Sequence, residues 1–151
     1  FKNMTLTNTN ENGFGIYTES ATVELFNVAL KGCGSAALNM STAASKNTLV
    51  ATRCEFANSG HGAFVEGSLT SATFNNCVFN DNQNCGIIAS KSTIHLHGEA
   101  TAVHSNRHSG ITAHNSCKVL LHLPSHHNTS YNNGSQDRAT SYGGTITNVE
   151  D

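Results

Sequence analysis

Short apolar segments alternate with polar turns along the chain, and a glycine returns every 24 residues. The four glycines, each after an Asn- or His-rich turn, are Gly62, Gly86, Gly110 and Gly134. Mostly apolar segments follow three of them directly, at 63–65, 87–89 and 111–113, and each segment predicts a short strand. A fixed period of this length is typical of stacked structural repeats.

Each repeat contains two further predicted strands. One comes shortly after the first strand, at 72–74, 93–97 and 119–123. The other precedes the polar turn, at 54–56, 77–79 and 101–103. Upstream, the segments 4–6, 12–16 and 28–30 repeat less regularly. The chain is therefore predicted to be an all-β solenoid of about six coils of roughly 24 residues, with three short strands per coil.

This arrangement resembles the right-handed parallel β-helix of the pectin-lyase-like superfamily, which includes carbohydrate-active enzymes, tailspikes, adhesins and binding modules. The resemblance covers nearly all of the chain, but it is architectural and implies no particular reaction. Stacked coils form parallel sheets and bury the apolar strand faces that a single coil leaves exposed. We expect residues 1–151 to form a single β-helix domain, with the more polar segment 135–151 as an irregular last coil or cap.

Composition narrows the function classes. Charged residues make up 12% of the chain and the formal net charge is −2, which argues against nucleic-acid binding because that relies on Lys and Arg. No apolar stretch approaches the roughly 18 residues that cross a bilayer, so no membrane insertion is expected. The chain begins at Phe1, inside a strand-like segment, which indicates a fragment or a processed product. An exposed first coil would then need cover from another domain or a partner, by end-to-end or side-by-side assembly.

Two of the five cysteines, Cys54 and Cys77, occupy equivalent positions in successive coils. They are expected to be stacked neighbours. The favoured interpretation is a pair of small buried thiols, and the alternative is a disulfide between coils.

Polar side chains recur at the same phase of the repeat and form two predicted rows. These rows are Asn80, His104 and Asn128, and Asn84, His108 and Asn132. Such rows can form hydrogen-bond ladders at the corners, present a polar groove to sugar hydroxyls, or do both. Together with Arg107 they are the candidate surface for a polysaccharide or a neighbouring protein chain.

A cluster of histidines is the most conspicuous chemical candidate. His95 and His97 alternate with Ile94 and Leu96, so both imidazoles face outward if the apolar pair faces the core. His122 lies on the next coil and is expected beside His97. Three imidazoles on adjacent strands can bind Zn²⁺. No acidic or cysteine ligand accompanies them at a motif spacing, so a solvated or partner-facing surface is favoured, a pH-responsive interface is a further option, and no cofactor is expected.

Catalytic carboxylates are sparse. The hydrolases of the superfamily resemble one another in using clustered aspartates, because glycoside hydrolysis needs a pair of carboxyl groups. The three aspartates here, Asp81, Asp137 and Asp151, lie far apart in the repeat. The triplet 60–62 resembles the His-Gly element of polygalacturonases, but the accompanying elements are missing and no role is assigned to His61.

The sequence therefore predicts a noncatalytic structural or recognition module on an extracellular, cell-wall or virion surface, with glycan as a candidate ligand. The alternative is a polysaccharide lyase or glycoside hydrolase of the pectin-lyase-like type.

Overall fold

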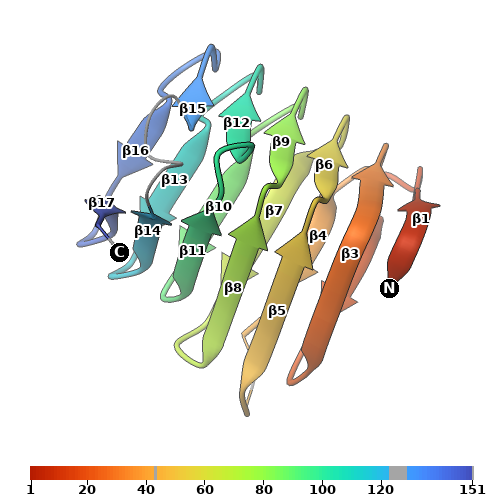
Figure 1. The fold of residues 1–151 in the computed structure, drawn as a ribbon, viewed down its shortest axis with the longest axis horizontal. Coiled ribbons are helices and arrows are strands. Elements are labelled where there is room, and N and C mark those ends of the chain that lie inside the picture. The colour runs from red at the N-terminus through yellow and green to blue at the C-terminus, as the bar shows by residue number, and fades with distance from the viewer. Residues whose placement is uncertain (43, 123–128, 151) are drawn as a thin grey trace.

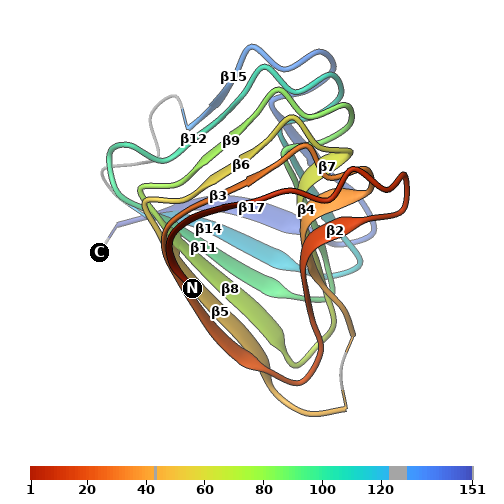
Figure 2. The same ribbon diagram turned by 90° about the vertical axis from the view of Figure 1, so that its right-hand side faces the viewer.

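The computed structural model describes residues 1–42, 44–122 and 129–150, and these residues form strands and no helix. The strands β1 to β17 follow one another around a common axis, and every strand pair is parallel. Figure 1 shows the strands of successive coils side by side, and Figure 2 shows the coils nearly end on, enclosing the core. The predicted solenoid of about six coils, with three strand segments per coil, is confirmed.

Three faces enclose the core. The first face consists of β2 (Phe14–Thr18), β4 (Ala36–Met40), β7 (His61–Glu66), β10 (Ile87–Ser90), β13 (Ile111–His114) and β16 (Arg138–Thr140). The second consists of the first half of β3 (Thr22–Lys31) with β5 (Asn47–Thr52), β8 (Thr70–Asn75), β11 (Thr93–His97), β14 (Lys118–His122) and β17 (Thr145–Val149). The third consists of β1 (Lys2–Leu6), the second half of β3, β6 (Glu55–Ala57), β9 (Val78–Asn80), β12 (Ala102–His104) and β15 (Ser130–Tyr131).

Apolar side chains alternate inward along the strands and stack from coil to coil. In the middle of the core, the rings of Phe56 and Phe79 lie parallel with centroids 4.7 Å apart, and Phe74 meets Phe79 edge on at 4.9 Å. All three rings are fully buried. Aromatic pairs of this geometry add attraction to the burial of apolar area, so the middle coils have a dense core.

The repeated glycine marks a position where two backbones come close. A Cβ atom at Gly62 would lie 2.4 Å from the carbonyl oxygen of Gly86 on the next coil. At Gly86 it would lie 2.8 Å from the carbonyl oxygen of Gly110. Only glycine fits such an approach, which explains the period that is visible in the sequence.

Asparagine side chains form a buried ladder at the corner between the third and first faces. Asn82 donates its side-chain amide to the carbonyl oxygen of Phe56 on the preceding coil at 3.1 Å, and to Oδ1 of Asn106 on the following coil at 2.8 Å. Asn106 repeats this arrangement with Phe79 and Asn133. Backbone N–H groups complete it, because Asn82 N–H donates to Asn106 Oδ1 and Asn106 N–H donates to Asn133 Oδ1.

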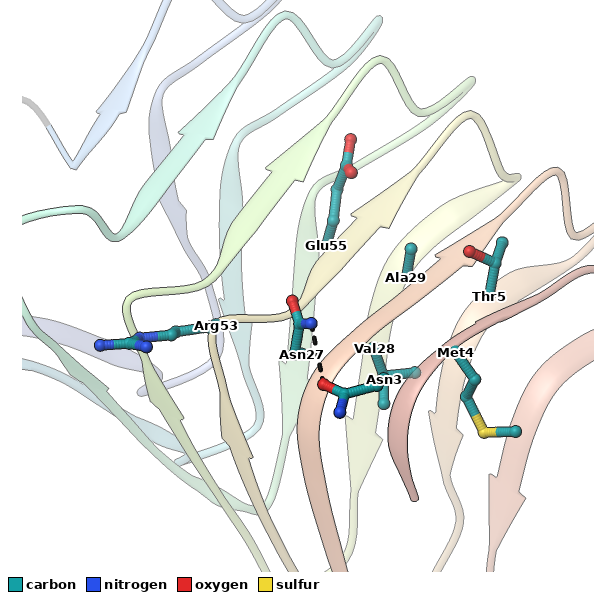
Figure 3. A pocket seen from close by; sticks show the side chains of 8 residues that line it. All are labelled: Asn3, Met4, Thr5, Asn27, Val28, Ala29, Arg53 and Glu55. Carbon is teal, nitrogen blue, oxygen red and sulfur yellow. Dashed lines mark hydrogen bonds between the residues drawn. The ribbon is translucent and has the colours of Figure 1, made fainter.

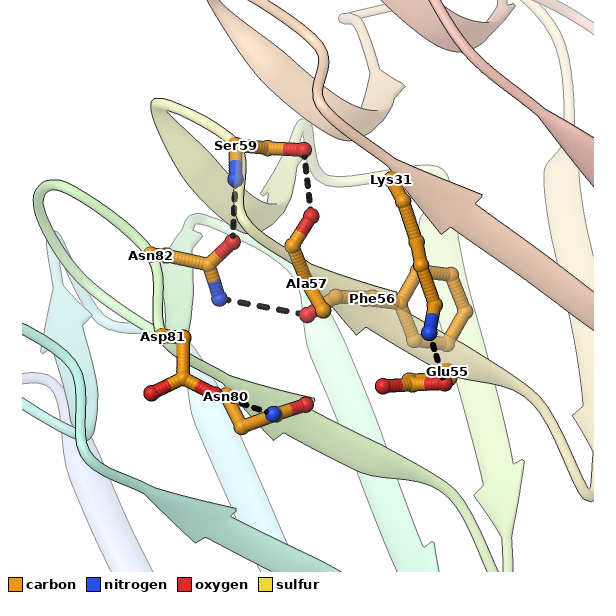
Figure 4. A network of polar contacts seen from close by, with 8 residues as sticks. All are labelled: Lys31, Glu55, Phe56, Ala57, Ser59, Asn80, Asp81 and Asn82. Carbon is orange, nitrogen blue, oxygen red and sulfur yellow. Dashed lines mark hydrogen bonds and ion pairs between the residues drawn. The ribbon is translucent and has the colours of Figure 1, made fainter.

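Different residue types occupy the two ends of this ladder. At the N-terminal end, Ser59 N–H donates to Asn82 Oδ1 at 3.1 Å, and the Ser59 hydroxyl donates to the Ala57 carbonyl (Figure 4). At the C-terminal end, Asn133 donates its side-chain amide to the Asp137 carboxylate at 2.9 Å. The side chains of Asn82, Asn106 and Asn133 therefore all have partners along the stack.

The last coil is longer than the sequence period predicts, which corrects two assignments. Asn82 and Asn106 are 24 residues apart, but Asn106 and Asn133 are 27 apart. As a result, Asp137 rather than Gly134 is the neighbour of Gly110 on the last coil, and its carbonyl oxygen faces Gly110. Gly134 lies instead against the backbone of Arg107. The predicted row was therefore wrong in including Gly134.

The same offset displaces Asn132 from its predicted row. Ser135 N–H donates to the His108 carbonyl, so Ser135 follows Asn84 and His108 in that row. Asn132 instead has a φ of 53°, the left-handed conformation that Ser105 also adopts at the corresponding turn. Asparagine adopts this conformation more easily than most residues, so the turn accounts for an asparagine at position 132.

The C-terminal segment continues the stack. β16 pairs with β13 and β17 pairs with β14, in regular parallel register. Residues 138–149 thus form strands of a sixth coil, and their function as a cap stays a prediction.

Cys54 and Cys77 are both buried free thiols. The Cys77 thiol contacts the Ala51 carbonyl at 3.4 Å, and Cys54 contacts the Thr52 carbonyl at 3.3 Å. The structure therefore has the pair of buried thiols that the sequence favoured, and no disulfide joins Cys54 to Cys77.

We expect Asn106→Ala to lower the free energy of unfolding by about 2–4 kcal/mol, because the substitution leaves buried backbone groups on both neighbouring coils without partners. Urea unfolding followed by far-UV circular dichroism measures the change. Asn12→Ala, at an exposed loop position, is the matched control and should change stability by less than about 0.5 kcal/mol. Equal effects of the two substitutions would show that the ladder does not stabilise the fold.

Candidate functional site

Three histidines gather on the outer side of the second face. His95 and His97 belong to β11, and His122 ends β14. The register places Leu96 opposite Leu121 in the core, so His97 and His122 occupy neighbouring outward positions. The sequence predicted this adjacency.

The three imidazoles stack closely. The His97 and His122 ring centroids lie 3.9 Å apart, and the His95 and His122 centroids 5.1 Å apart. Nδ1 of His95 lies 2.9 Å from Nε2 of His122, a hydrogen bond in which one ring donates to the other. One nitrogen from each ring can be chosen so that all three lie within 4.8 Å of one another.

The pKa of one imidazole, that of His95, is shifted. Burial, and then the nearby His122 ring, lower the pKa of His95 below its ordinary value of 6.5. A neutral imidazole has one nitrogen with a free lone pair, which makes it a hydrogen-bond acceptor or a metal ligand.

The predicted polar rows lie along the corner that follows the third face. Asn80 and His104 are register neighbours, and the row continues with Tyr131, whose ring stacks on His104 at 5.2 Å. Asn128, predicted in that row, lies outside the described residues. Asn84 and His108 are adjacent across coils through a backbone hydrogen bond, and Arg107 beside them is exposed.

The carboxylates of the registered strands are dispersed. Glu24 lies opposite Val50, Glu55 lies between Ala29 and Val78, and Glu66 lies opposite Ser90. Glu55 also forms an ion pair with Lys31 at 2.7 Å (Figure 4). Thus none of these three carboxylates has a second carboxylate at an adjacent register position.

A pocket that the sequence analysis missed opens on the first face. It has a volume of about 210 Å³ and is lined by Phe14, Ser35, Ala36, Asn39, His61 and Phe64. Three adjacent strands contribute: β2, β4 and β7. The small side chain of Ala36 lies between Phe14 and His61 in the register, which leaves the hollow. Its sequence signal is limited to the aromatic residues Phe14 and Phe64, because the pattern did not predict β4.

The polar groups of this pocket are uncharged. His61 Nδ1 accepts a hydrogen bond from the Cys85 backbone N–H at 3.3 Å. Burial, and then the nearby His108 imidazole, lower the pKa of His61 below its ordinary 6.5. His61 is therefore neutral at pH 7, and the remaining lining residues carry no ionisable side chain.

A larger and more open hollow of about 450 Å³ lies on the third face (Figure 3). It is lined by Asn3, Met4, Thr5, Asn27, Val28, Ala29, Arg53 and Glu55. Asn27 donates to Asn3 Oδ1 at 2.9 Å across two coils, so part of its polar lining is already paired. Arg53 and Glu55 give this hollow one positive and one negative side chain, whereas no acidic, Lys or Arg side chain lines the first-face pocket.

Parallel coils, a buried asparagine ladder and outward polar surfaces define a β-solenoid protein. The family model described as the right-handed β-helix region matches residues 1–101, and the chain belongs to this family. No curated protein and no solved structure matches the chain. Among the described residues there is no helix long and apolar enough to span a membrane.

We expect His61 to titrate below pH 6.5, and His108→Ala to raise its pKa while leaving it below 6.5, because burial remains. The folded protein binds this proton less readily than the unfolded chain does. The associated stability is therefore complete above about pH 6.5 and decreases as the pH falls toward the lower folded-state pKa. NMR titration of the imidazole Cε1–H signals measures both effects, with the exposed His108 signal assigned by the same variant. A His61 pKa at or above 6.5 in the folded protein would contradict this expectation.

Proposed function

We propose that this chain is a noncatalytic recognition module that binds a neutral glycan in the first-face pocket, and that it acts on an extracellular, cell-wall or virion surface. The observation that carries the proposal is the combination in this pocket of two aromatic rings with uncharged hydrogen-bonding groups, all on a rigid sheet face.

The lining matches the chemistry of a sugar. The rings of Phe14 and Phe64 offer apolar surface to the C–H groups of a pyranose, while Ser35, Asn39 and His61 offer donors and acceptors to its hydroxyls. Sites for small molecules combine apolar walls with a few placed polar groups in the same way. The volume is below the roughly 300–1,000 Å³ typical of sites for drug-sized ligands, which favours a single sugar ring.

The surface around the pocket extends this chemistry. Tyr17 is 50% exposed, and its ring lies 5.8 Å from that of Phe14. It is the register neighbour of Asn39, which in turn neighbours Phe64. At the corner, Asn84 and the His108 imidazole near His61 continue the polar surface toward later coils. This row supports binding of an extended chain that places one of its sugar rings in the pocket.

The absence of charge in the pocket argues for a neutral sugar. A uronate carboxylate would need a cationic or donor-rich partner to replace its hydration. The dispersed carboxylates of the registered strands also support binding without cleavage, because glycoside hydrolysis requires two carboxyl groups flanking one bond.

The test is binding of soluble neutral polysaccharides and, in parallel, polyuronates to protein made in bacteria, so that no N-glycan occupies Asn39 in the sequon 39–41. Size-exclusion chromatography follows both co-elution and polymer length. We expect co-elution with a neutral polymer whose length does not change. Shortened polymer, preference for polyuronate, or no co-elution at all would each overturn the proposal.

We expect Phe64→Ala to weaken binding at least about fivefold, because truncating a central aromatic contact costs more than about 1 kcal/mol. Phe26→Ala is the matched control, since Phe26 is an aromatic residue 40% exposed on the second face. Isothermal titration with an oligosaccharide of the polymer that co-elutes measures both affinities. Equal losses in the two variants would place the glycan elsewhere.

A further inference from the structure

We propose that His95, His97 and His122 form a binding site for one divalent transition-metal ion of the zinc class. The site lies on the second face, away from the first-face pocket, and does not depend on the glycan proposal.

The backbone brings the three ligands together before any ion binds. Side chains two apart on a strand project from the same face, which joins His95 to His97 on β11. Parallel register then sets His122 of β14 beside His97. Both strands are held in the middle of the second face, with β8 on one side and β17 on the other. The Cα positions of the ligands are therefore fixed by the ladder of backbone hydrogen bonds.

The distances between donor atoms are close to those of a metal site. Zn–N bonds of about 2.0–2.1 Å in tetrahedral geometry place two ligand nitrogens about 3.3 Å apart. The His95 Nδ1 to His122 Nε2 distance is 2.9 Å, and the complete set of three donors lies within 4.8 Å. Ring rotations that change the spacing of the donor nitrogens by a few tenths of an ångström to about 1.5 Å would bring all three to the spacing of a tetrahedral zinc site.

An ion would replace the hydrogen bond between His95 and His122. In that bond one ring nitrogen carries the proton. For metal binding this ring takes its other tautomer, so that both facing nitrogens present lone pairs. The proton moves to the other nitrogen of the same ring by exchange with water, so the number of protons bound to the protein does not change.

The surrounding residues indicate which ions fit. Thr73 and Asn75 are the register neighbours of His95 and His97 on β8, and Leu120 lies opposite His95 on β14. These neighbours supply no carboxylate, so the ligand set is three imidazoles, which bind a metal ion through their unprotonated nitrogens. Imidazole suits Zn²⁺, Ni²⁺ and Cu²⁺, whereas Ca²⁺ and Mg²⁺ require oxygen ligands. Three protein ligands leave a fourth position for water.

The consequence for the fold is a link between two coils. β11 belongs to the fourth coil and β14 to the fifth, so a bound ion joins them through side chains in addition to the backbone ladder. An ion that binds the folded state stabilises it by mass action.

The experiment is isothermal titration of the full chain, without an affinity tag and after chelator treatment, with Zn²⁺ alone. We expect one ion per chain, and a loss of affinity of at least about 100-fold for His97→Ala and for His122→Ala. His104→Ala, which removes a histidine stacked on Tyr131, is the matched control and should leave the affinity unchanged. A second control replaces His126 and His127, which lie outside the described residues.

Two outcomes would overturn the proposal. One is Zn²⁺ affinity that survives the loss of His97 and His122, and the other is affinity that disappears only with His126 and His127. Circular dichroism in the presence of chelator checks that each variant is folded. Should a variant fail to fold, X-ray absorption of the zinc-loaded wild-type protein decides the question, since the site requires three imidazole nitrogens in the first coordination shell. Thermal unfolding gives a further readout: Zn²⁺ should raise the Tm of the wild type and of His104→Ala, and leave that of folded His97→Ala unchanged.

Discussion

The structure depends on one constraint, which is that the buried corner from Ser59 to Asn133 must find its hydrogen-bond partners on the neighbouring coils. Asn82 and Asn106 at this corner are each 1% exposed, so their polar groups need partners within the protein. Asn82, Asn106 and Asn133 meet the constraint, because an amide side chain both donates and accepts. A hydrophobic residue would leave these backbone groups unpaired at a cost of about 1–3 kcal/mol each. A charged residue would add the cost of burying a charge.

Fixing the corner also fixes the outward rows. Once the ladder aligns one coil with the next, each strand position faces the same position of its neighbours. The first-face pocket is a product of the parallel strand register, since Phe14, Ala36 and His61 follow one another in a single row across β2, β4 and β7. The stack of His97 on His122 is another. Both sites thus consist of residues distant in sequence that the period brings together.

Much of the fold was predictable because close backbone approach allows only glycine. Gly62, Gly86 and Gly110 revealed the period, and the outward histidines followed from simple alternation with Ile94 and Leu96. The prediction failed where the period changes to 27 residues, so that Gly134 and Asn132 were placed three residues away from their true positions in the repeat.

The ladder itself and the pocket were less accessible from sequence. Many asparagines occur in the turns, and their spacing does not distinguish the buried Asn82 from the half-buried Asn84 two residues later. The inward direction of an amide depends on the tertiary turn geometry. The pocket depends on β4, whose sequence lacks β-branched and aromatic residues, and on the hollow over Ala36, which the sequence pattern does not reveal.

The ladder has a polarity, with Ser59 at one end and Asp137 at the other and interchangeable asparagines between them. A coil inserted or deleted between Ser59 and Asp137 would find the same asparagine partners on both sides. The solenoid can therefore change length by whole coils while the corner keeps the same hydrogen bonds. The first-face pocket lies on the first three coils and the histidines lie on the fourth and fifth. Their separation along the axis is consequently quantised, in steps of about 4.8 Å, and gene rearrangements that add or remove one repeat would alter the reach between the two surfaces while preserving each of them.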